Sequence, residues 1–490
     1  MQSSNHQMTS SVAAIALTMF AVLILLLTIS VSAQAQTYTP LYSFGVDDST
    51  QNGPYGQLAL GRDGNFYGEV NPIRSEVYVI STGGSEALLW ESPQPNNPQD
   101  QCVNGLTLGA DGLLYGTCNE WQDNTDNGGV IFVYDPAQGQ AGPTLLYKFP
   151  YCNYSTYHLS PLTLGTDGNL YGTTAGSAGC PGNYTYGTFF RITPAGVFKI
   201  LHIFQGSAAN EPGTPTGALT LGADGNFYGT SQIGGNPQDY NGGTVYKITP
   251  KGKVTLLYSF PNTGPETPMG GVTQGADGKW YGTTMYGGTS SQGTIFQLAG
   301  KKLKVLHNFN YAVDSAGFPI YPLTLGSDGN FYGPSLTFNM GGYGSESLFK
   351  ITTKGVYTDL YKLQAAACPQ GTADGCYLSS PMPLHPNGNF YGTNAEGGAV
   401  GRGMFYELST GLKPYIIMQF PLGKKGTSIG IFGVGLTGTT GVYFNGVSAQ
   451  FTVASDTYLT ATIPTGATAG YVTVATPTGT LKSATKFKVK

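Results

Sequence analysis

Carboxylates are the side chains of this sequence most able to do chemistry, because two Asp or Glu residues can act as acid and base on a glycosidic bond. Five candidates lie in or near expected loops and outside the repeated positions described below: Glu69, Glu120, Glu211, Glu266 and Glu396. No two of them are paired by sequence. A two-carboxylate hydrolase is therefore compatible with the composition, but no catalytic residue is assigned.

The histidines offer no acid–base pair that the sequence reveals. His202 and His307 occupy a place that tyrosine holds in matching segments of the chain, which favours a role in packing. His158 and His385 lie near expected hairpins, and no pattern gives either of them a hydrogen-bond partner. His6 falls in an N-terminal targeting segment.

Metal and cofactor sites are not predicted. Asp123, Asp126 and Asn127 form an oxygen-rich stretch, but the spacing of a calcium-binding EF-hand is absent, and a solvated loop is the better interpretation. The glycines of residues 433–438 match the G-x-G-x-x-G pattern. That pattern binds a dinucleotide when a helix follows, and here a strand is expected, so the nucleotide interpretation is rejected.

One turn recurs seven times and sets the architecture. Its Asp or Asn residues are Asp63, Asp111, Asp167, Asp224, Asp277, Asp328 and Asn387. A tyrosine follows each of them four residues later. A residue needed once in every repeat is expected to serve the turn, because an Asx side chain bonds its own backbone.

The segments around this turn predict four strands per repeat. Leu219 to Thr230 shows the unit: Leu-x-Leu alternates as a half-buried strand, Gly-x-Asp-Gly turns the chain, and Phe-Tyr-Gly-Thr begins the return strand. A second pair of strands follows, as in Val245–Ile248 and Leu256–Phe260. Four strands in every 48 to 59 residues predict an all-β, seven-bladed propeller over residues 36–412.

These phrases resemble the GloVer tandem repeat of exported bacterial proteins, a resemblance that implies no defined activity. From residue 413 the repeat ends, and Gly426–Ile429, Val442–Gly446 and Tyr471–Val474 read as short strands between Gly and Pro turns. Residues 413–490 resemble the IPT/TIG Ig-like domain along their whole length. This resemblance implies a β-sandwich that acts as a spacer or binding module, without catalytic residues.

The N-terminal segment is expected to complete the last blade. Thr39–Phe44 looks like the outermost strand of a repeat, yet it precedes the first hairpin. Pairing of this segment beside Phe405–Leu408 would close the propeller and remove its exposed edges.

The first 35 residues are interpreted as a signal peptide. Val12–Val31 is almost wholly apolar, and Ala33–Ala35 matches an A-x-A cleavage site, although the run is also long enough for an uncleaved anchor. The six cysteines then suggest disulfides. Two pairs flank hairpin turns nearly symmetrically and one closes a short loop: Cys102–Cys118, Cys152–Cys180 and Cys368–Cys376.

Charge and loop composition decide between function classes. Charged residues make up 10% of the chain and the net charge is −4, so the basic stripe that nucleic acid requires is not expected. The loops are rich in Gly, Tyr, Asn and Ser, which suits recognition better than proton transfer. We therefore expect a secreted or cell-surface, non-enzymatic binding protein, with polysaccharide as the ligand class. An extracellular carbohydrate-active hydrolase or lyase and a structural envelope component remain alternatives.

Overall fold

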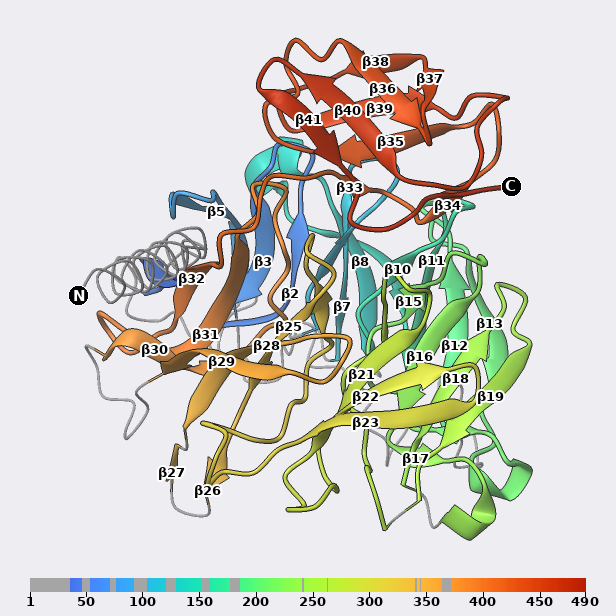
Figure 1. Ribbon diagram of the computed structural model, residues 1–490, viewed down its shortest axis with the longest axis vertical. Coiled ribbons are helices and arrows are strands. Elements are labelled where there is room, and N and C mark those ends of the chain that lie inside the picture. The colour runs from blue at the N-terminus through green and yellow to red at the C-terminus, as the bar shows by residue number, and fades with distance from the viewer. Residues whose placement is uncertain are drawn as a thin grey trace, which may run out of the picture. The chain divides into compact units, whose positions relative to one another are not determined.

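The chain is all-β in the computed structural model (Figure 1). The structure describes residues 36–45, 53–70, 76–91, 104–119, 129–150, 159–176, 186–239, 242–261, 263–339, 342–343, 345–363 and 372–490. Besides strands, these residues contain short 3-10 helices: η1 (Pro136–Ala141), η2 (Ser207–Ala209) and η3 (Pro237–Asp239). No described helix has the length and apolar character needed to cross a bilayer. The targeting segment of residues 1–35 lies outside the described residues.

Seven antiparallel four-stranded sheets follow one another along residues 37–409 of the described chain. Sheet 1 holds β2 (Pro54–Leu60), β3 (Phe66–Val70), β4 (Glu76–Ile80) and β5 (Glu86–Glu91); sheet 2 holds β6 (Leu106–Leu108), β7 (Leu114–Cys118), β8 (Val130–Tyr134) and β9 (Thr144–Lys148). Sheet 3 holds β10 (Thr163–Leu164), β11 (Leu170–Thr174), β12 (Thr188–Ile192) and β13 (Phe198–Ile203); sheet 4 holds β15 (Thr220–Leu221), β16 (Phe227–Ser231), β18 (Thr244–Ile248) and β19 (Val254–Ser259).

The remaining sheets keep the same order. Sheet 5 holds β20 (Thr273–Gln274), β21 (Trp280–Thr284), β22 (Thr294–Ala299) and β23 (Lys302–Asn308); sheet 6 holds β24 (Thr324–Leu325), β25 (Phe331–Ser335), β28 (Glu346–Ile351) and β29 (Tyr357–Leu363). Sheet 7 holds β30 (Thr372–Leu378), β31 (Phe390–Gly398), β32 (Met404–Ser409) and β1 (Thr37–Ser43). Short strand pairs lie in connecting loops: β14 (Pro212–Gly213) with β17 (Ile233–Gly234), and β26 (Phe338–Asn339) with β27 (Gly342–Tyr343).

The predicted completion of the last sheet by the N-terminal segment is confirmed. Strand β1 pairs antiparallel with β32, with Thr39 opposite Glu407 and Tyr42 opposite Phe405. Phe44, just after the strand, is 1% exposed and donates its backbone N–H to the carbonyl of Gly403 at 3.0 Å. The first and last parts of the repeat region are therefore joined by backbone hydrogen bonds.

Hydrophobic cores lie between successive sheets, since each sheet presents one apolar face to its neighbour. One core joins Tyr67 and Val77 of sheet 1 to Leu114 and Phe132 of sheet 2. Another joins sheet 7 to sheet 1 through side chains that include Phe405 and Phe66, whose rings lie 6.0 Å apart. Sheet 7 thus packs against sheet 1 as well as against sheet 6.

Residues 413–490 form two further four-stranded sheets around a core of their own (Figure 1). One holds β33 (Ile417–Met418), β35 (Ser428–Phe432), β39 (Tyr458–Thr462) and β38 (Phe451–Val453). The other holds β37 (Val447–Ala449), β36 (Gly441–Phe444), β40 (Val472–Thr476) and β41 (Gly479–Lys482), and a parallel pair joins β34 (Leu422–Gly423) to β42 (Lys488–Val489). The element that follows the glycines of residues 433–438 is strand β36 and not a helix, as predicted when the nucleotide interpretation was rejected.

The C-terminal sheets contact the recurring Asp-Gly turns of the repeat region. Thr457 donates its hydroxyl to the carbonyl of Arg62 at 2.7 Å, and the Arg62 guanidinium lies 4.9 Å from the centre of the Tyr458 ring. The N–H of Tyr415, just before β33, donates to the carbonyl of Pro386 in the turn of sheet 7 at 3.0 Å. These contacts fix the C-terminal sheets on turns that belong to sheets 1 and 7.

Candidate binding site

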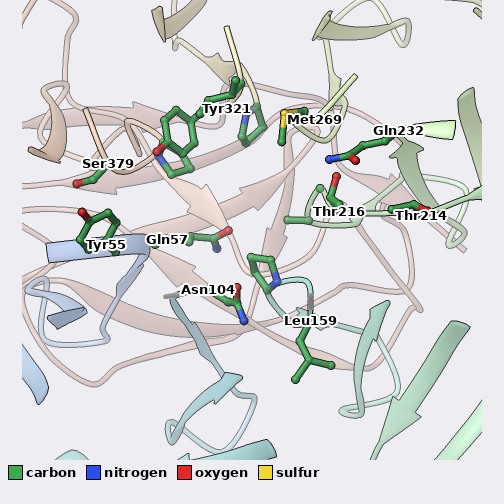
Figure 2. Close-up of a pocket in the computed structure, with 18 residues that line it drawn as sticks. Tyr55, Gln57, Asn104, Leu159, Thr214, Thr216, Gln232, Met269, Tyr321 and Ser379 are labelled. Carbon is green, nitrogen blue, oxygen red and sulfur yellow. The ribbon is translucent and has the colours of Figure 1, made fainter. Parts of the chain in front are cut away.

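A cavity of about 460 Å³ lies where the innermost segments of all seven sheets meet (Figure 2). The chain contributes to it at matched positions, each three residues before a buried Leu, Val or Met that recurs once in every sheet: Leu58, Leu106, Leu162, Leu219, Val272, Leu323 and Met382. The lining residues at these positions are Tyr55, Leu159, Thr216, Met269, Ile320 and Ser379, and the matching position of sheet 2, Val103, lies outside the described residues. The repeat therefore builds the wall, while the identity of the side chain varies from sheet to sheet.

The lining is mostly apolar and carries no charge. Tyr, Leu, Met, Ile and Pro supply 8 of its 18 residues, Gln, Asn, Thr and Ser supply six, and no Asp, Glu, His, Lys or Arg is among the described lining residues. Three lining groups are already used within the protein, one of them the Asn104 amide, which donates to the carbonyl of Thr117 at 3.3 Å. Tyr321 donates its hydroxyl to the carbonyl of Leu378 at 3.2 Å, and Ser379 donates to the carbonyl of Pro54 at 2.6 Å.

Three neutral polar groups of the lining are uncommitted. Figure 2 shows Gln57 and Gln232 extending their amides into the cavity from opposite sides, and neither amide has a hydrogen-bond partner among the described residues. The hydroxyl of Thr216 is buried and likewise has no partner there. The Thr216 oxygen has almost no accessible surface, so the two amides are the groups open to a ligand rich in hydroxyls or amides.

Three aromatic side chains cluster around a residue that lies close in sequence to the cavity lining. Phe318, two residues before the lining residue Ile320, lies 5.7 Å from the ring of Tyr286 and 5.7 Å from that of Tyr311. Tyr286 is 41% exposed and Tyr311 is 37% exposed. The exposed ring faces of the two tyrosines are suited to stacking against a flat apolar surface.

Two buried carboxyl groups hold the cavity wall from behind. Glu69 accepts the N–H of Gly105 at 3.0 Å, next to the lining residue Asn104. Glu346 accepts the N–H of Leu378 at 3.0 Å, next to Ser379. Burial raises the pKa of Glu69 to about 8 and, with a smaller contribution from the charge of Glu396, that of Glu346 to about 7.

The carboxylates singled out in the sequence are therefore dispersed. Glu69 bonds the backbone behind the wall, and Glu211 bonds a histidine on an outer strand. Glu266 forms a backbone bridge with Tyr286, and Glu396 lies opposite Cys376 in sheet 7. Glu120 lies outside the described residues. The structure does not bring any two of the four described candidates to the cavity. Glu346, which the sequence analysis missed, shows itself in the sequence by replacing the glycine that precedes this strand in other repeats.

Two histidines have carboxylate partners that the sequence did not reveal. His202 Nε2 lies 3.1 Å from Glu211 Oε2, and His307 Nε2 lies 2.9 Å from Asp314 Oδ2. Both histidines lie on outermost strands, β13 and β23, whereas the cavity is lined by the innermost segments. These pairs join an outer strand to the loop that follows it. His385 is part of no such pair: its Nδ1 accepts the N–H of Asn387 at 3.1 Å, and its Nε2 lies 3.2 Å from the carbonyl of Gly64.

The recurring Asp makes the same bonds in six repeats. In sheet 3, Asp167 accepts the N–H of Asn169 at 3.2 Å and the hydroxyl of Tyr171 at 2.8 Å. The corresponding Tyr-to-Asp distances for Asp63, Asp111, Asp224, Asp277 and Asp328 run from 2.6 to 3.0 Å. In the seventh repeat the bond runs the other way: the Asn387 amide donates to the Tyr391 hydroxyl at 2.8 Å, and that hydroxyl donates to Glu407 at 2.7 Å.

Removing one of these carboxylates should destabilise the protein. We expect Asp167→Ala to lower the free energy of unfolding by about 1–3 kcal/mol, because it leaves the Tyr171 hydroxyl without its acceptor. Urea unfolding measures the loss. Asp167→Asn, which keeps the acceptor for the backbone N–H, should lose less than half as much. An equal loss in both variants would contradict this role for the carboxylate.

The cysteine and metal predictions fall largely outside the described residues. Cys118 and Cys376 are disulfide-bonded. Their predicted partners, Cys102 and Cys368, lie outside the described residues, as do Cys152 and Cys180, so the pairing stays a prediction. The oxygen-rich stretch of residues 123–127 and His158 also lie outside. Among the described residues, no group of three or more His, Cys, Asp or Glu side chains is placed to hold a metal ion.

Comparison with known proteins supports the repeat. Residues 214–450 match the family model of the Gloeobacter/Verrucomicrobia repeat. No curated protein matches the sequence.

Several solved structures share part of the fold. Virginiamycin B lyase from Staphylococcus aureus is 16% identical, with 76% of this chain and 98% of that one covered and a TM-score of 0.48. A fungal alcohol oxidase of the AA5 family is 13% identical, with 93% and 98% covered and a TM-score of 0.46. A putative oxidoreductase from Thermus thermophilus is 15% identical, with 76% and 100% covered and a TM-score of 0.40. At these values the likeness carries no inference about activity.

Proposed function

We propose that this chain is a non-enzymatic binding protein that recognises a polysaccharide in the cavity lined by its innermost segments. The supporting observation is the lining itself: a mostly apolar surface that carries no charge, with uncommitted amides at Gln57 and Gln232. Sugars present hydroxyl groups to such amides and apolar ring faces to aromatic side chains. Proton transfer would instead require an ionisable group within hydrogen-bond reach of the ligand.

The architecture proposed for this role is a seven-bladed propeller with a C-terminal IPT/TIG-like sandwich. The seven four-stranded sheets and the packing of sheet 7 on sheet 1 support the blade number. The two sheets around a separate core support the sandwich. We further propose that residues 1–35 direct export, so that the protein is secreted or displayed at the cell surface.

A glycan array probed with the full chain tests the function. We expect binding to at least one neutral glycan, weakened tenfold or more by Gln57→Ala and by Gln232→Ala, because each removes a group that faces the cavity. Gln138→Ala, on the exposed helix η1, is the matched control and should bind as the unmodified protein does.

Enzymatic turnover of a glycan would support the alternative function, that of a carbohydrate-active enzyme. An extracellular hydrolase or lyase would release shortened glycan, and a single carboxylate substitution such as Glu120→Gln or Glu266→Gln would abolish that release. Either observation would overturn the non-enzymatic proposal. A structural envelope component would bind no glycan and would show no response to the cavity variants.

A further inference from the structure

The C-terminal module has a charge opposite to that of the rest of the chain. Residues 413–490 contain seven lysines and one acidic residue, Asp456. The whole chain has 23 basic and 27 acidic residues, so the first 412 residues hold 16 basic and 26 acidic side chains. A net acidic protein thus carries a distinctly basic terminal module, a charge asymmetry that is typical of binding to a polyanion.

Five of these lysines gather along the paired strands β34 and β42, and we call them the basic edge: Lys424, Lys425, Lys486, Lys488 and Lys490. Leu422 lies opposite Lys488 in the parallel pair, so the two lysines that follow β34 lie beside the end of β42. The N–H of Lys490 donates to the carbonyl of Gly423 at 2.8 Å, which holds the two segments together.

The strand directs its lysines outward. Residues alternate between the two sides of a strand, and Phe487 and Val489 pack into the core of the module. The intervening residues Lys486, Lys488 and Lys490 are all exposed, spaced by two residues or about 6.6 Å along the strand. Lys424 and Lys425 are exposed as well. The basic edge is therefore a set of exposed lysines whose backbone positions are held close together by the paired strands.

No acidic group within the module neutralises this row. Among the described residues none of the five lysines forms a salt bridge. Asp456 is occupied elsewhere, since its carboxylate accepts the N–H groups of Gly435 at 3.1 Å and Thr437 at 3.2 Å. The Lys490 ammonium lies against the turn at Gly225 of sheet 4, so Lys424, Lys425, Lys486 and Lys488 carry the charge that remains free for a partner.

We propose that the basic edge binds an acidic polysaccharide, at a site separate from the cavity. The chemistry of the edge favours this class of polyanion. None of the exposed large hydrophobic side chains of the described chain lies in residues 413–490, so the module has no such side chain to insert into a lipid surface or to stack on bases. All its basic residues are lysines, which act as point charges and lack the fork by which arginine pairs with phosphate.

Binding of the full chain to polygalacturonate, with neutral dextran as the comparison, tests the inference. We expect binding that weakens steeply as salt is raised, and a loss of tenfold or more when Lys424, Lys425, Lys486 and Lys488 are all changed to Glu. The matched control changes Lys251, Lys253, Lys301 and Lys302 to Glu. These lysines are also exposed, and their replacement alters the net charge equally but leaves the basic edge intact.

The results of these experiments distinguish binding at the basic edge from binding in the cavity. Gln57→Ala should leave polygalacturonate binding unchanged whether or not the cavity binds a neutral glycan. Equal loss in the two fourfold variants would attribute the binding to net charge and overturn the proposal. Absence of polygalacturonate binding, or tighter binding to duplex DNA or to phosphatidylglycerol vesicles, would overturn it as well.

Discussion

Replacing Phe44 with alanine should lower the free energy of unfolding by about 3–5 kcal/mol, the usual cost of deleting a fully buried phenylalanine. Phe44 is 1% exposed, and its ring lies 5.1 Å from that of Tyr78 in sheet 1. It belongs to the core that joins sheet 7 to sheet 1, although it lies near the beginning of the described chain. The substitution therefore tests whether the contact between sheets 7 and 1 stabilises the protein as much as a contact between two sheets in the middle of the repeat region.

The repeat supplies a matched comparison for Phe44. Phe260 occupies the same position in sheet 4, is 0% exposed and donates its N–H to the carbonyl of Gly243 at 2.9 Å, as Phe44 does to Gly403. Phe260→Ala should cost as much as Phe44→Ala in a urea titration, whereas Val313→Ala, at an 81% exposed side chain, should change little. A Phe44→Ala loss close to that of Val313→Ala would show that the N-terminal strand adds little to the stability.

The parts of this fold that could be predicted are those encoded within a few residues. The Asp-Gly turn and its tyrosine lie four residues apart, and the strands on either side alternate in polarity, so the hairpin is visible in the sequence. The position of β1 was also predictable, because Thr39–Phe44 repeats a strand pattern found elsewhere and the last sheet needed a fourth strand.

The cavity could not be predicted in the same way, because its chemistry is distributed around the ring. Gln57 and Gln232 are separated by 175 positions and are brought to one cavity by the arrangement of the sheets. Glu346 and Leu378 present a similar case. Four other pairs of neighbouring sheets have glycine at the Glu346 position of one sheet and proline at the Leu378 position of the next, as at Pro215 and Pro268, and proline has no N–H to satisfy. Glu346 and the leucine together form a bond across 32 residues.

Replacing the two buried glutamates with neutral glutamines should make the protein more stable at alkaline pH. The pKa of Glu69 is raised to about 8 and that of Glu346 to about 7, in each case chiefly by burial, whereas both groups titrate near 4.5 in the unfolded chain. Between pH 5 and 8 the folded protein therefore binds more protons than the unfolded protein. Its free energy of unfolding should fall as pH rises through this range.

Glutamine keeps an oxygen that can accept the N–H of Gly105 or Leu378 and carries no charge to desolvate. At pH 8.5 we therefore expect Glu69→Gln and Glu346→Gln each to be more stable than the unmodified protein, by about 3 kcal/mol for Glu346, since each unit of pKa shift corresponds to about 1.4 kcal/mol. At pH 4.5 the difference should vanish. Urea midpoints measured from pH 4.5 to 8.5 check this, with Glu266→Gln as a control at a partly exposed carboxylate. Variants that are less stable than the unmodified protein at pH 8.5 would show that the wall is held by ionised carboxylates.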